Sequence, residues 1–315
     1  MAVTTTIELR PQPPPIQSGA GSGVTIRRRW RRAWRKETFA QSLTALIGGL
    51  MVALVVSASI FAEAISPHDP LAQEITQRLR PPFWMEGGTG ANLLGTDSLG
   101  RDILSRMIFG SRISLIVGFS AVIVAGTIGV TLGMLAAYFK GAVDLILSRI
   151  ADIQQAIPFL ILIIAVVAVV GASLLNLILV LGVGSWLFYY RVVRGETLSV
   201  REEPYVEAAR IVGCTTPRIL FRYILPNVSA SIIVIGTLFV PQVILFEAGL
   251  SFLGLGVQPP TPTWGGMIAE GRDYVASAWW LSVVPGFAIM LTVLGINLVG
   301  DWLREVLDPR QSKGR

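Results

Sequence analysis

The chain has 315 residues, of which 52% are hydrophobic and only 15% are charged, and its mean hydropathy is +0.63. This apolar content exceeds what a soluble core of that length can bury, so lipid must serve as part of the solvent. The net charge of +6 is compatible with nucleic-acid binding, but the Lys and Arg residues flank apolar runs and form no basic domain with interleaved aromatic residues. The composition therefore excludes an ordinary soluble domain and argues against a nucleic-acid partner.

The chain contains one cysteine, Cys214, and one histidine, His68. A single cysteine forms no disulfide framework and no Cys-rich metal site, and a single histidine removes most zinc sites and most His-dependent catalytic schemes. We therefore expect neither a metal site nor an enzymatic active site in this chain.

The N-terminal residues 1–40 are predicted to form a basic, disordered cytoplasmic tail. Pro11–Gly23 is rich in Pro, Gly, Ser and Gln and has too few apolar residues to fold alone. Arg27–Lys36 combines clustered arginines with two tryptophans, which favours attraction to anionic lipid over a specific partner. The apolar run at 41–65 follows without a small-residue cleavage site and is interpreted as an uncleaved first transmembrane helix.

Six apolar runs are long enough to cross a bilayer as helices, which predicts an all-α, polytopic membrane protein. The runs are Ser42–Ile65, Ile113–Phe139, Ile150–Val170, Leu174–Tyr190, Val228–Leu250 and Trp280–Val299.

Most of the 26 Lys and Arg residues lie in alternate connecting segments, which places both termini in the cytoplasm. The chain is then divided into an extracytoplasmic segment, 66–112, a five-helix core, 113–300, and a cytoplasmic tail, 301–315. The core contains a long cytoplasmic loop, 195–227.

The loop between the fourth and fifth spans, Arg191–Asn227, is far longer than the 2–8 residues that usually connect packed helices. Glu202–Pro204 predicts a helix start, because acidic residues and proline are favoured in the first turn. Gly213 breaks that helix, and Thr215–Thr216 can cap a second short helix that we expect to end at Pro226. A loop of this length with its own capped helices indicates a function.

The first of these short helices is predicted to present a small apolar face. Tyr205, Ala208, Ala209 and Val212 recur at helical spacing, whereas Glu207 faces elsewhere. An amphipathic helix laid into a hydrophobic groove is a common mode of recognition between proteins. The pattern therefore predicts a docking helix.

The chain has no phosphate-binding loop of the Gly-x-x-x-x-Gly-Lys-[Ser/Thr] type, so its energy must come from a partner or from an ion gradient. The spans are nearly free of the charged residues that gradient-driven carriers use. Glu247, near the outer end of the fifth span, is a candidate pathway residue, although we favour an interfacial carboxylate that accepts hydrogen bonds from loop amides. Gly126, Gly129 and Gly133 form a stripe that predicts close packing with another helix.

Four motifs resemble those of binding-protein-dependent ABC importer permeases of the dipeptide, oligopeptide and nickel family, specifically the second of their two permease subunits. The cytoplasmic loop carries Glu207-Ala208-Ala209, Gly213 and Leu225-Pro226. The other three stretches are Leu94–Arg106, Glu247–Pro260 and Leu307–Arg310. The similarity covers about Leu43 to Arg310. Tyr223 departs from the family pattern, which has an aliphatic residue two positions before the Leu-Pro pair.

The resemblance implies a type I importer permease fold and two interaction sites. In that family the loop motif forms a coupling helix that docks on an ATPase subunit. This role is transferred to Glu207, Ala208, Ala209, Gly213, Leu225 and Pro226. The family pattern also implies that 66–112 contains an amphipathic helix near the docking surface for a solute receptor. The matching residues are Gly95, Thr96, Asp97, Gly100, Arg101 and Asp102, for which an anion-binding turn is the less favoured interpretation.

We therefore expect a permease subunit of the bacterial inner membrane that performs no covalent chemistry. Its expected partners are a second, related permease, two ATPase subunits that bind ATP and Mg²⁺, an extracytoplasmic solute-binding protein and membrane lipid. The chain itself needs no cofactor. A gradient-driven secondary transporter is the main alternative, and the solute is left open among dipeptides, oligopeptides, nickel, glutathione and similar small molecules.

Overall fold

The computed structural model of the chain describes residues 43–307, so the predicted N-terminal tail and the last eight residues lie outside the described part. Within 43–307 the regular structure is helical, and the only β-type pairing is an isolated bridge between Thr96 and Asp102. The all-α prediction is confirmed.

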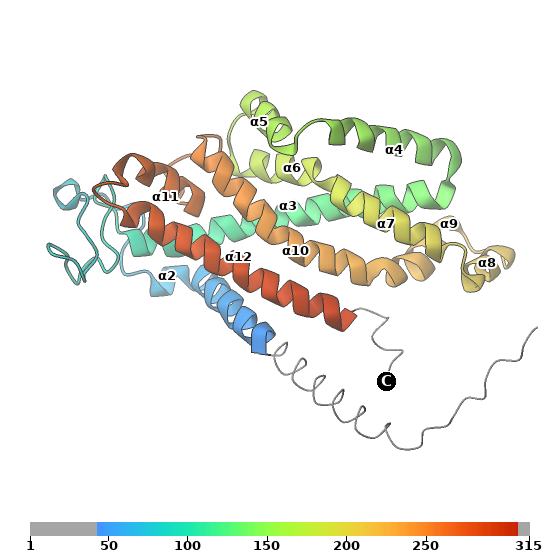
Figure 1. The fold of residues 1–315 in the computed structure, drawn as a ribbon, viewed down its shortest axis with the longest axis horizontal. Coiled ribbons are helices and arrows are strands. Elements are labelled where there is room, and N and C mark those ends of the chain that lie inside the picture. Colours follow the sequence, from blue (N-terminus) through green and yellow to red (C-terminus); the bar gives the residue numbers. More distant parts are fainter. Residues whose placement is uncertain (1–42, 308–315) are drawn as a thin grey trace, which may run out of the picture. The chain divides into compact units, whose positions relative to one another are not determined.

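The helices are labelled in chain order in Figure 1, which shows α8 and α11 near opposite ends of the long helix α3. The first helix spans Leu43–Ile60. The others are α2 (Ala62–Ile65), α3 (Ile103–Phe139), α4 (Gly141–Ala156), α5 (Phe159–Val170), α6 (Leu174–Gly184), α7 (Trp186–Val200), α8 (Pro204–Ile211), α9 (Thr216–Ile219), α10 (Leu225–Phe252), α11 (Trp264–Gly271) and α12 (Trp280–Leu307), with 3₁₀ turns at Ile75–Gln77 and Arg272–Tyr274 and a π-helical turn at Leu220–Ile224.

Five helical segments of the described chain are long and apolar enough to cross a membrane, and a bent pair raises the number to six. The bent pair is α4 and α5, which meet at 89°. The sequence predicted a single helix over Ile150–Val170 after a loop, and this is wrong, because two helices meet at a break inside this range. Pro158 lacks an N–H and keeps Ile157 out of the α region, so the helix breaks there.

Helix α3 begins ten residues earlier than the predicted span. The Asp102 side chain accepts a hydrogen bond from the Ser105 N–H at 2.8 Å and caps the helix. Residues 103–112 are therefore the first turns of α3, and the described segment before them contains only a 3₁₀ turn and, at its border, the short helix α2. A helix of 37 residues is about 55 Å long, which exceeds the roughly 30 Å hydrocarbon core.

The fifth span runs without interruption from Thr216 to Phe252, so the prediction that Pro226 ends a second short helix is wrong. Proline in a regular helix removes one hydrogen bond and crowds the carbonyl four residues before it. Here the π-helical turn directly precedes α10 and widens the backbone where the ring needs room. Asn227 Nδ2 also donates to the Tyr223 carbonyl at 2.6 Å.

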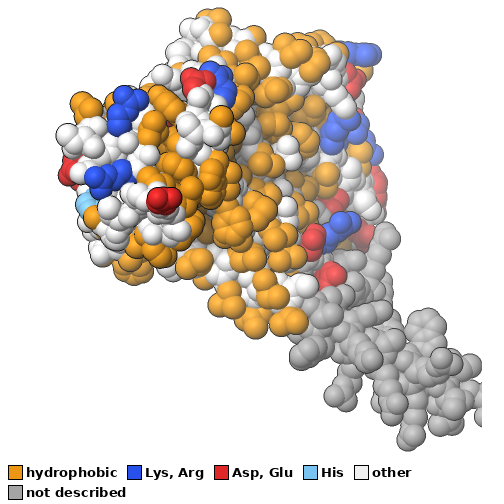
Figure 2. Space-filling model, turned by 60° about the vertical axis from the view of Figure 1, so that its left-hand side comes forward, with side chains coloured by type: hydrophobic (Ala, Val, Ile, Leu, Met, Phe, Trp, Pro, Cys, Tyr) orange, Lys and Arg blue, Asp and Glu red, His pale blue; other side chains and the backbone are white. Residues whose placement is uncertain are grey.

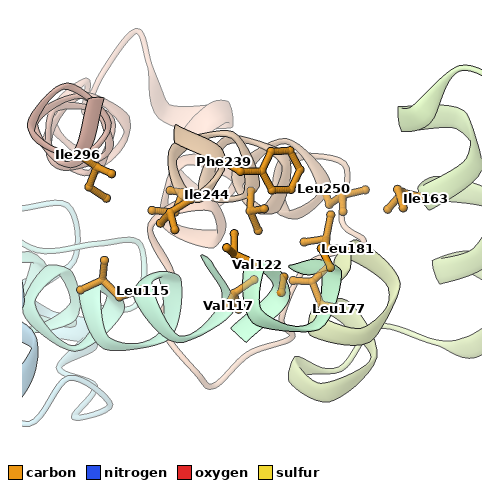
Figure 3. Close-up of a cluster of buried hydrophobic side chains, with 14 of the residues drawn as sticks. Leu115, Val117, Val122, Ile163, Leu177, Leu181, Phe239, Ile244, Leu250 and Ile296 are labelled. Atoms are coloured by element: carbon orange, nitrogen blue, oxygen red, sulfur yellow. The ribbon is translucent and has the colours of Figure 1, made fainter. Parts of the chain in front are cut away.

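The main hydrophobic cluster lies where α3, α6, α10 and α12 meet. Figure 3 shows Leu115, Val117 and Val122 of α3 facing side chains of α10 and α6, with Ile296 contributed by α12. In Figure 2 hydrophobic side chains also cover much of the visible outer face. Exposed apolar side chains such as Leu54 on the first helix are those expected to face lipid.

The glycine stripe of α3 packs directly against α7. A Cβ atom on Gly129 would lie 2.3 Å from the Trp186 carbonyl oxygen, and one on Gly133 would lie 2.9 Å from that of Tyr190. Gly126 faces the ring of Tyr189. The prediction that these glycines allow close helix packing is confirmed.

Candidate functional site

Helix α8 begins and ends where the sequence predicts. Pro204 lies in its first turn, and its C-terminus is closed by Gly213, whose φ of +82° is in the left-handed region. The Gly213 N–H donates to the Arg210 carbonyl at 2.9 Å and the Cys214 N–H donates to that of Ala209 at 3.0 Å. These two bonds form a Schellman motif, which satisfies carbonyls that the helix end leaves unpaired.

The two faces of α8 have different environments. Val206 is fully buried and Ala209 nearly so, in a cluster with Met134 of α3 and Val193 of α7. The opposite face is exposed, and Ile211 and Val212 have exposed fractions of 80% and 82%.

The residues on the exposed face of α8 differ in part from those predicted. Tyr205, Ala208 and Val212 are exposed as expected, together with the first-turn residue Glu207. Ala209 belongs to the buried face instead. Ile211 also belongs to the exposed face, although it was not among the predicted residues. Its apolar side chain, three residues after Ala208, is the sequence signal for this position.

The returning chain supports α8 from behind. Leu225 packs against the cluster that holds Val206, whereas Pro226 is exposed. Tyr223, the residue that departs from the family pattern, also packs against this cluster. Leu225 and Tyr223 therefore contribute to the support of α8, and neither belongs to its exposed face.

The C-terminal end of α3 is tied to the chain just before α8. Arg201 Nη1 donates to the carbonyls of Ala137 at 2.8 Å and Tyr138 at 2.7 Å. Lys140 Nζ lies 2.8 Å from Glu202 Oε1, and this hydrogen bond and the charge of the ammonium group lower the pKa of the Glu202 carboxyl.

The second candidate site is a cluster of four charged groups, Asp97, Arg101, Arg106 and Glu270, which we call the charge cluster. Asp97 Oδ2 accepts from Arg101 Nε at 2.6 Å and from Arg106 Nη1. Glu270 Oε2 accepts from Arg101 Nη2 at 2.8 Å and from Arg106 Nη1 at 2.6 Å, and Glu270 Oε1 accepts from Arg106 Nη2 at 2.9 Å. Two carboxylates thus neutralise two guanidinium groups, which argues against an anion-binding turn.

The other predicted motif residues shape the backbone around this cluster. Asp102 caps α3 and also accepts from Asn92 Nδ2 at 2.9 Å. Thr96 Oγ1 accepts from the Arg80 N–H at 2.9 Å. Gly100 has a φ of +77°, and a Cβ atom there would lie 1.9 Å from the Glu74 carbonyl oxygen. Gly95 has a similar conformation against Arg80.

Two members of the charge cluster were not selected from the sequence. Arg106 is the last residue of the motif Leu94–Arg106, and Glu270 lies 164 residues further along, on α11. Glu270 follows the mostly apolar residues Trp264–Ala269 and lies two residues before the charged pair Arg272-Asp273, so its own charge does not single it out. No spacing rule predicts which distant partner such a residue meets.

Glu247 is fully buried on α10, so the prediction of an interfacial carboxylate bonded to loop amides is wrong. Its Oε1 accepts from Ser251 Oγ at 2.8 Å, and its Oε2 lies 3.5 Å from Ser114 Oγ of α3. Among residues 43–307, no Lys or Arg side chain forms an ion pair with it. Ser251 and Thr263 also line a cavity of about 130 Å³ beside it.

Comparisons with known proteins agree with this architecture. Residues 129–313 match the family described as binding-protein-dependent transport system inner membrane component. Residues 28–82 match the N-terminal TM domain of oligopeptide transport permease C.

Two curated relatives and one solved structure are similar over most of their length. The di/tripeptide transport system permease protein DppC of Pseudomonas aeruginosa is 44% identical, over 87% of this chain and 90% of that protein. The glutathione transport system permease protein GsiD of Pectobacterium atrosepticum is 42% identical, over 91% and 93%. An inward-facing structure of the MetNI methionine ABC transporter has a TM-score of 0.52 and 21% identity, over 64% of this chain and 96% of that one, and supports the fold.

The fold and these matches define a multi-pass, non-catalytic membrane component of an ABC importer. The chain belongs to the family of binding-protein-dependent transport system inner membrane components and is a permease subunit. The resemblance noted from the sequence motifs is confirmed, and a gradient-driven secondary transporter is not favoured.

Proposed function

We propose that this permease subunit imports di- or oligopeptides with energy from separate ATPase subunits, and that α8 is the helix through which it couples to them. The observation that carries the coupling role is the exposed apolar face of α8, on a helix that is capped at its end and packed from behind. Exposed apolar patches on an otherwise supported helix are typical of protein interaction sites.

The proposed orientation of the chain in the membrane rests on the charge distribution. Lys and Arg residues concentrate in the N-terminal tail and in the segments around α8, so these regions are cytoplasmic and both termini lie on that side. The charge cluster and the chain from 66 to 102 then face the other side. That surface receives the solute-binding protein, and a second, related permease completes the pathway across the inner membrane.

The solute class rests on the relatives, whose names include di/tripeptide and dipeptide permeases and a glutathione permease. All of these solutes are short peptides or peptide-like molecules. ATP and Mg²⁺ are bound by the ATPase partners. The permease supplies the pathway, the coupling helix α8 and the surface for the solute-binding protein.

A cross-linking experiment tests the coupling role at single-residue resolution. The only cysteine, Cys214, is replaced by serine, and Ala208→Cys is introduced on the exposed face of α8. Ala209→Cys is the matched control, because it is the adjacent alanine and is buried. The whole complex in membranes is labelled with benzophenone maleimide and irradiated, and the products are identified by mass spectrometry.

We expect Ala208→Cys to cross-link to an ATPase subunit and Ala209→Cys to give little product. Labelled Ala208→Cys that cross-links only to lipid, or no better than the control, would refute the coupling role. The solute class is tested by measuring uptake of a labelled dipeptide into proteoliposomes. We expect uptake to require the solute-binding protein on one side of the membrane and ATP on the side that α8 faces.

A further inference from the structure

The C-terminus of α3 is capped by an arginine that lies more than 60 residues further along the chain. The last carbonyls of a helix have no partner within the helix, and here Arg201 donates to two of them, at Ala137 and Tyr138. Its positive charge also lies at the negative end of the helix dipole. Because Arg201 is three residues before α8, this contact fixes the entry to α8 against α3.

A second contact comes from within α8 itself. The guanidinium carbon of Arg210 lies 5.0 Å from the centre of the Tyr138 ring, which is a cation–π geometry. The same residue of α3 thus accepts a hydrogen bond from Arg201 at its carbonyl and contacts Arg210 with its ring. These two contacts bracket α8 at both ends.

Apolar packing completes the attachment. Val206 and Ala209 of α8 share a hydrophobic cluster with Met134, one turn before Tyr138 on α3. An eight-residue helix has little stability of its own, so its position is set by what it packs against. The position of α8 is therefore set by the end of α3 together with α7 and the returning chain from Ile219 to Val228, which belong to the same cluster.

The other end of α3 reaches the charge cluster. Asp102 caps its N-terminus, and Arg106, in its first turns, pairs with Asp97 and with Glu270 of α11. Between Ile103 and Phe139 the helix has no proline and no break. One continuous helix thus connects the α8 attachment with the charge cluster (Figure 1).

We propose that Tyr138, Arg201 and Arg210 are positioning residues that clamp α8 to α3, so that displacement of α8 moves α3 as a rigid body and reaches the charge cluster. This inference rests on the proposed coupling role of α8 and adds the residues that transmit its motion. Without the clamp, α8 moves locally and ATP hydrolysis proceeds without a matching movement of the permease. Coupling between two distant sites requires an element that moves between two positions and contacts both sites. A rigid helix attached at both ends meets this requirement.

The test uses the purified complex of permeases and ATPases in proteoliposomes with the solute-binding protein. The variants are Tyr138→Leu, Arg201→Gln and Arg210→Gln. Two conservative controls keep the interaction, Tyr138→Phe by retaining the ring and Arg210→Lys by retaining the cation. Arg218→Gln, at an exposed arginine of α9, controls for loss of a positive charge.

The measured quantities are labelled dipeptide taken up per ATP hydrolysed and stimulation of ATP hydrolysis by the solute-binding protein. We expect the three disruptive variants to lower uptake per ATP at least fivefold and to lose most of the stimulation, with the controls within twofold of the unmodified complex. Because Tyr138 and Arg210 act through one contact, the double variant Tyr138→Leu/Arg210→Gln is expected to be no worse than the more affected single variant.

Each outcome distinguishes transmission of motion through the clamp from a purely structural role of these residues. Normal uptake per ATP in assembled Tyr138→Leu and Arg210→Gln complexes overturns the clamp, as does a loss of assembly by all three variants, which marks a purely structural role. If Arg201→Gln alone fails to assemble, the clamp is tested by comparing uptake per ATP in Tyr138→Leu and Tyr138→Phe. Failure of Ala208→Cys to cross-link in the otherwise unmodified complex overturns the coupling role itself, whereas retained cross-linking with normal coupling overturns only the clamp.

Discussion

Replacing Gly129 by alanine should destabilise the permease by forcing α3 and α7 apart. The added Cβ atom would lie 2.3 Å from the Trp186 carbonyl oxygen and 2.6 Å from Tyr189 Cβ. Normal contacts between such atoms are about 3.5 Å, so the two helices must separate locally by roughly 1 Å. Backbone and Cβ atoms form this contact, and neither can rotate away as the end of a flexible side chain does.

The expected net cost is about 1–2 kcal/mol. Overpacking a well-packed interface costs about 1–3 kcal/mol, and a contact between backbone and Cβ atoms that cannot rotate away belongs to the upper part of that range, about 2–3 kcal/mol. Alanine recovers about 1 kcal/mol because its helix propensity is higher than that of glycine. The matched control is Gly195→Ala on α7, where no atom beyond the chain neighbours and the helix's own backbone lies within 4 Å of the added Cβ. That variant should be unchanged or slightly more stable.

The assay is thermal unfolding of the purified protein in mild detergent, followed by tryptophan fluorescence. A loss of 1–2 kcal/mol corresponds to a decrease in apparent Tm of about 2–8 °C, on the scale of 2–4 °C per kcal/mol for chains of 150–250 residues. An apparent Tm for Gly129→Ala equal to or above that of Gly195→Ala would show that α3 and α7 do not approach as closely as the structure indicates.

Three further predictions concern the two candidate sites and Glu247. Asp97→Asn removes one negative charge from beside two buried guanidinium groups and should lower the free energy of unfolding by about 3–5 kcal/mol. Asp273→Asn, in an exposed pair, should cost less than about 1 kcal/mol, and equal costs for the two variants in thermal unfolding would refute the buried network. Gly213→Val should lower uptake per ATP, because a left-handed φ costs a residue with a Cβ about 1–2 kcal/mol, and Gly213→Asn should be milder; normal coupling in the Val variant would contradict this. Glu247→Gln should keep its hydroxyl partners and change stability by less than about 1 kcal/mol, whereas Glu247→Leu should cost about 1–3 kcal/mol by leaving them unpaired; a large loss in the Gln variant would show that the charge itself is required.

Features that depend on neighbouring residues were predictable from the sequence. A run of about 20 apolar residues predicts a span wherever it occurs. Four of the six predicted runs lie within candidate spans of the described chain, and a fifth, Ser42–Ile65, overlaps the first helix, Leu43–Ile60. The limits of α8 were also predicted, because proline in a first turn and glycine at a helix end act through their own backbone. The motif residues Gly95 to Asp102 were selected as one group, and the structure brings them together.

Features that depend on distant contacts were not predictable. The sequence places Ala209 with Ala208, yet only the packing of α8 against α3 and α7 decides which alanine is buried. Glu270 meets Arg106 because α11 returns beside α3, and no local pattern encodes that meeting. The same holds for Glu247, whose partners come from two helices.

The sequence by itself thus determined the class of protein, most of its spans and the position of α8, since hydrophobic length, capping residues and motifs are properties of short segments. The tertiary structure decided which face of that helix is free, which charges neutralise one another and how α3 connects the two sites. These depend on side chains from helices far apart in the chain, and their pairing is settled only when the helices pack.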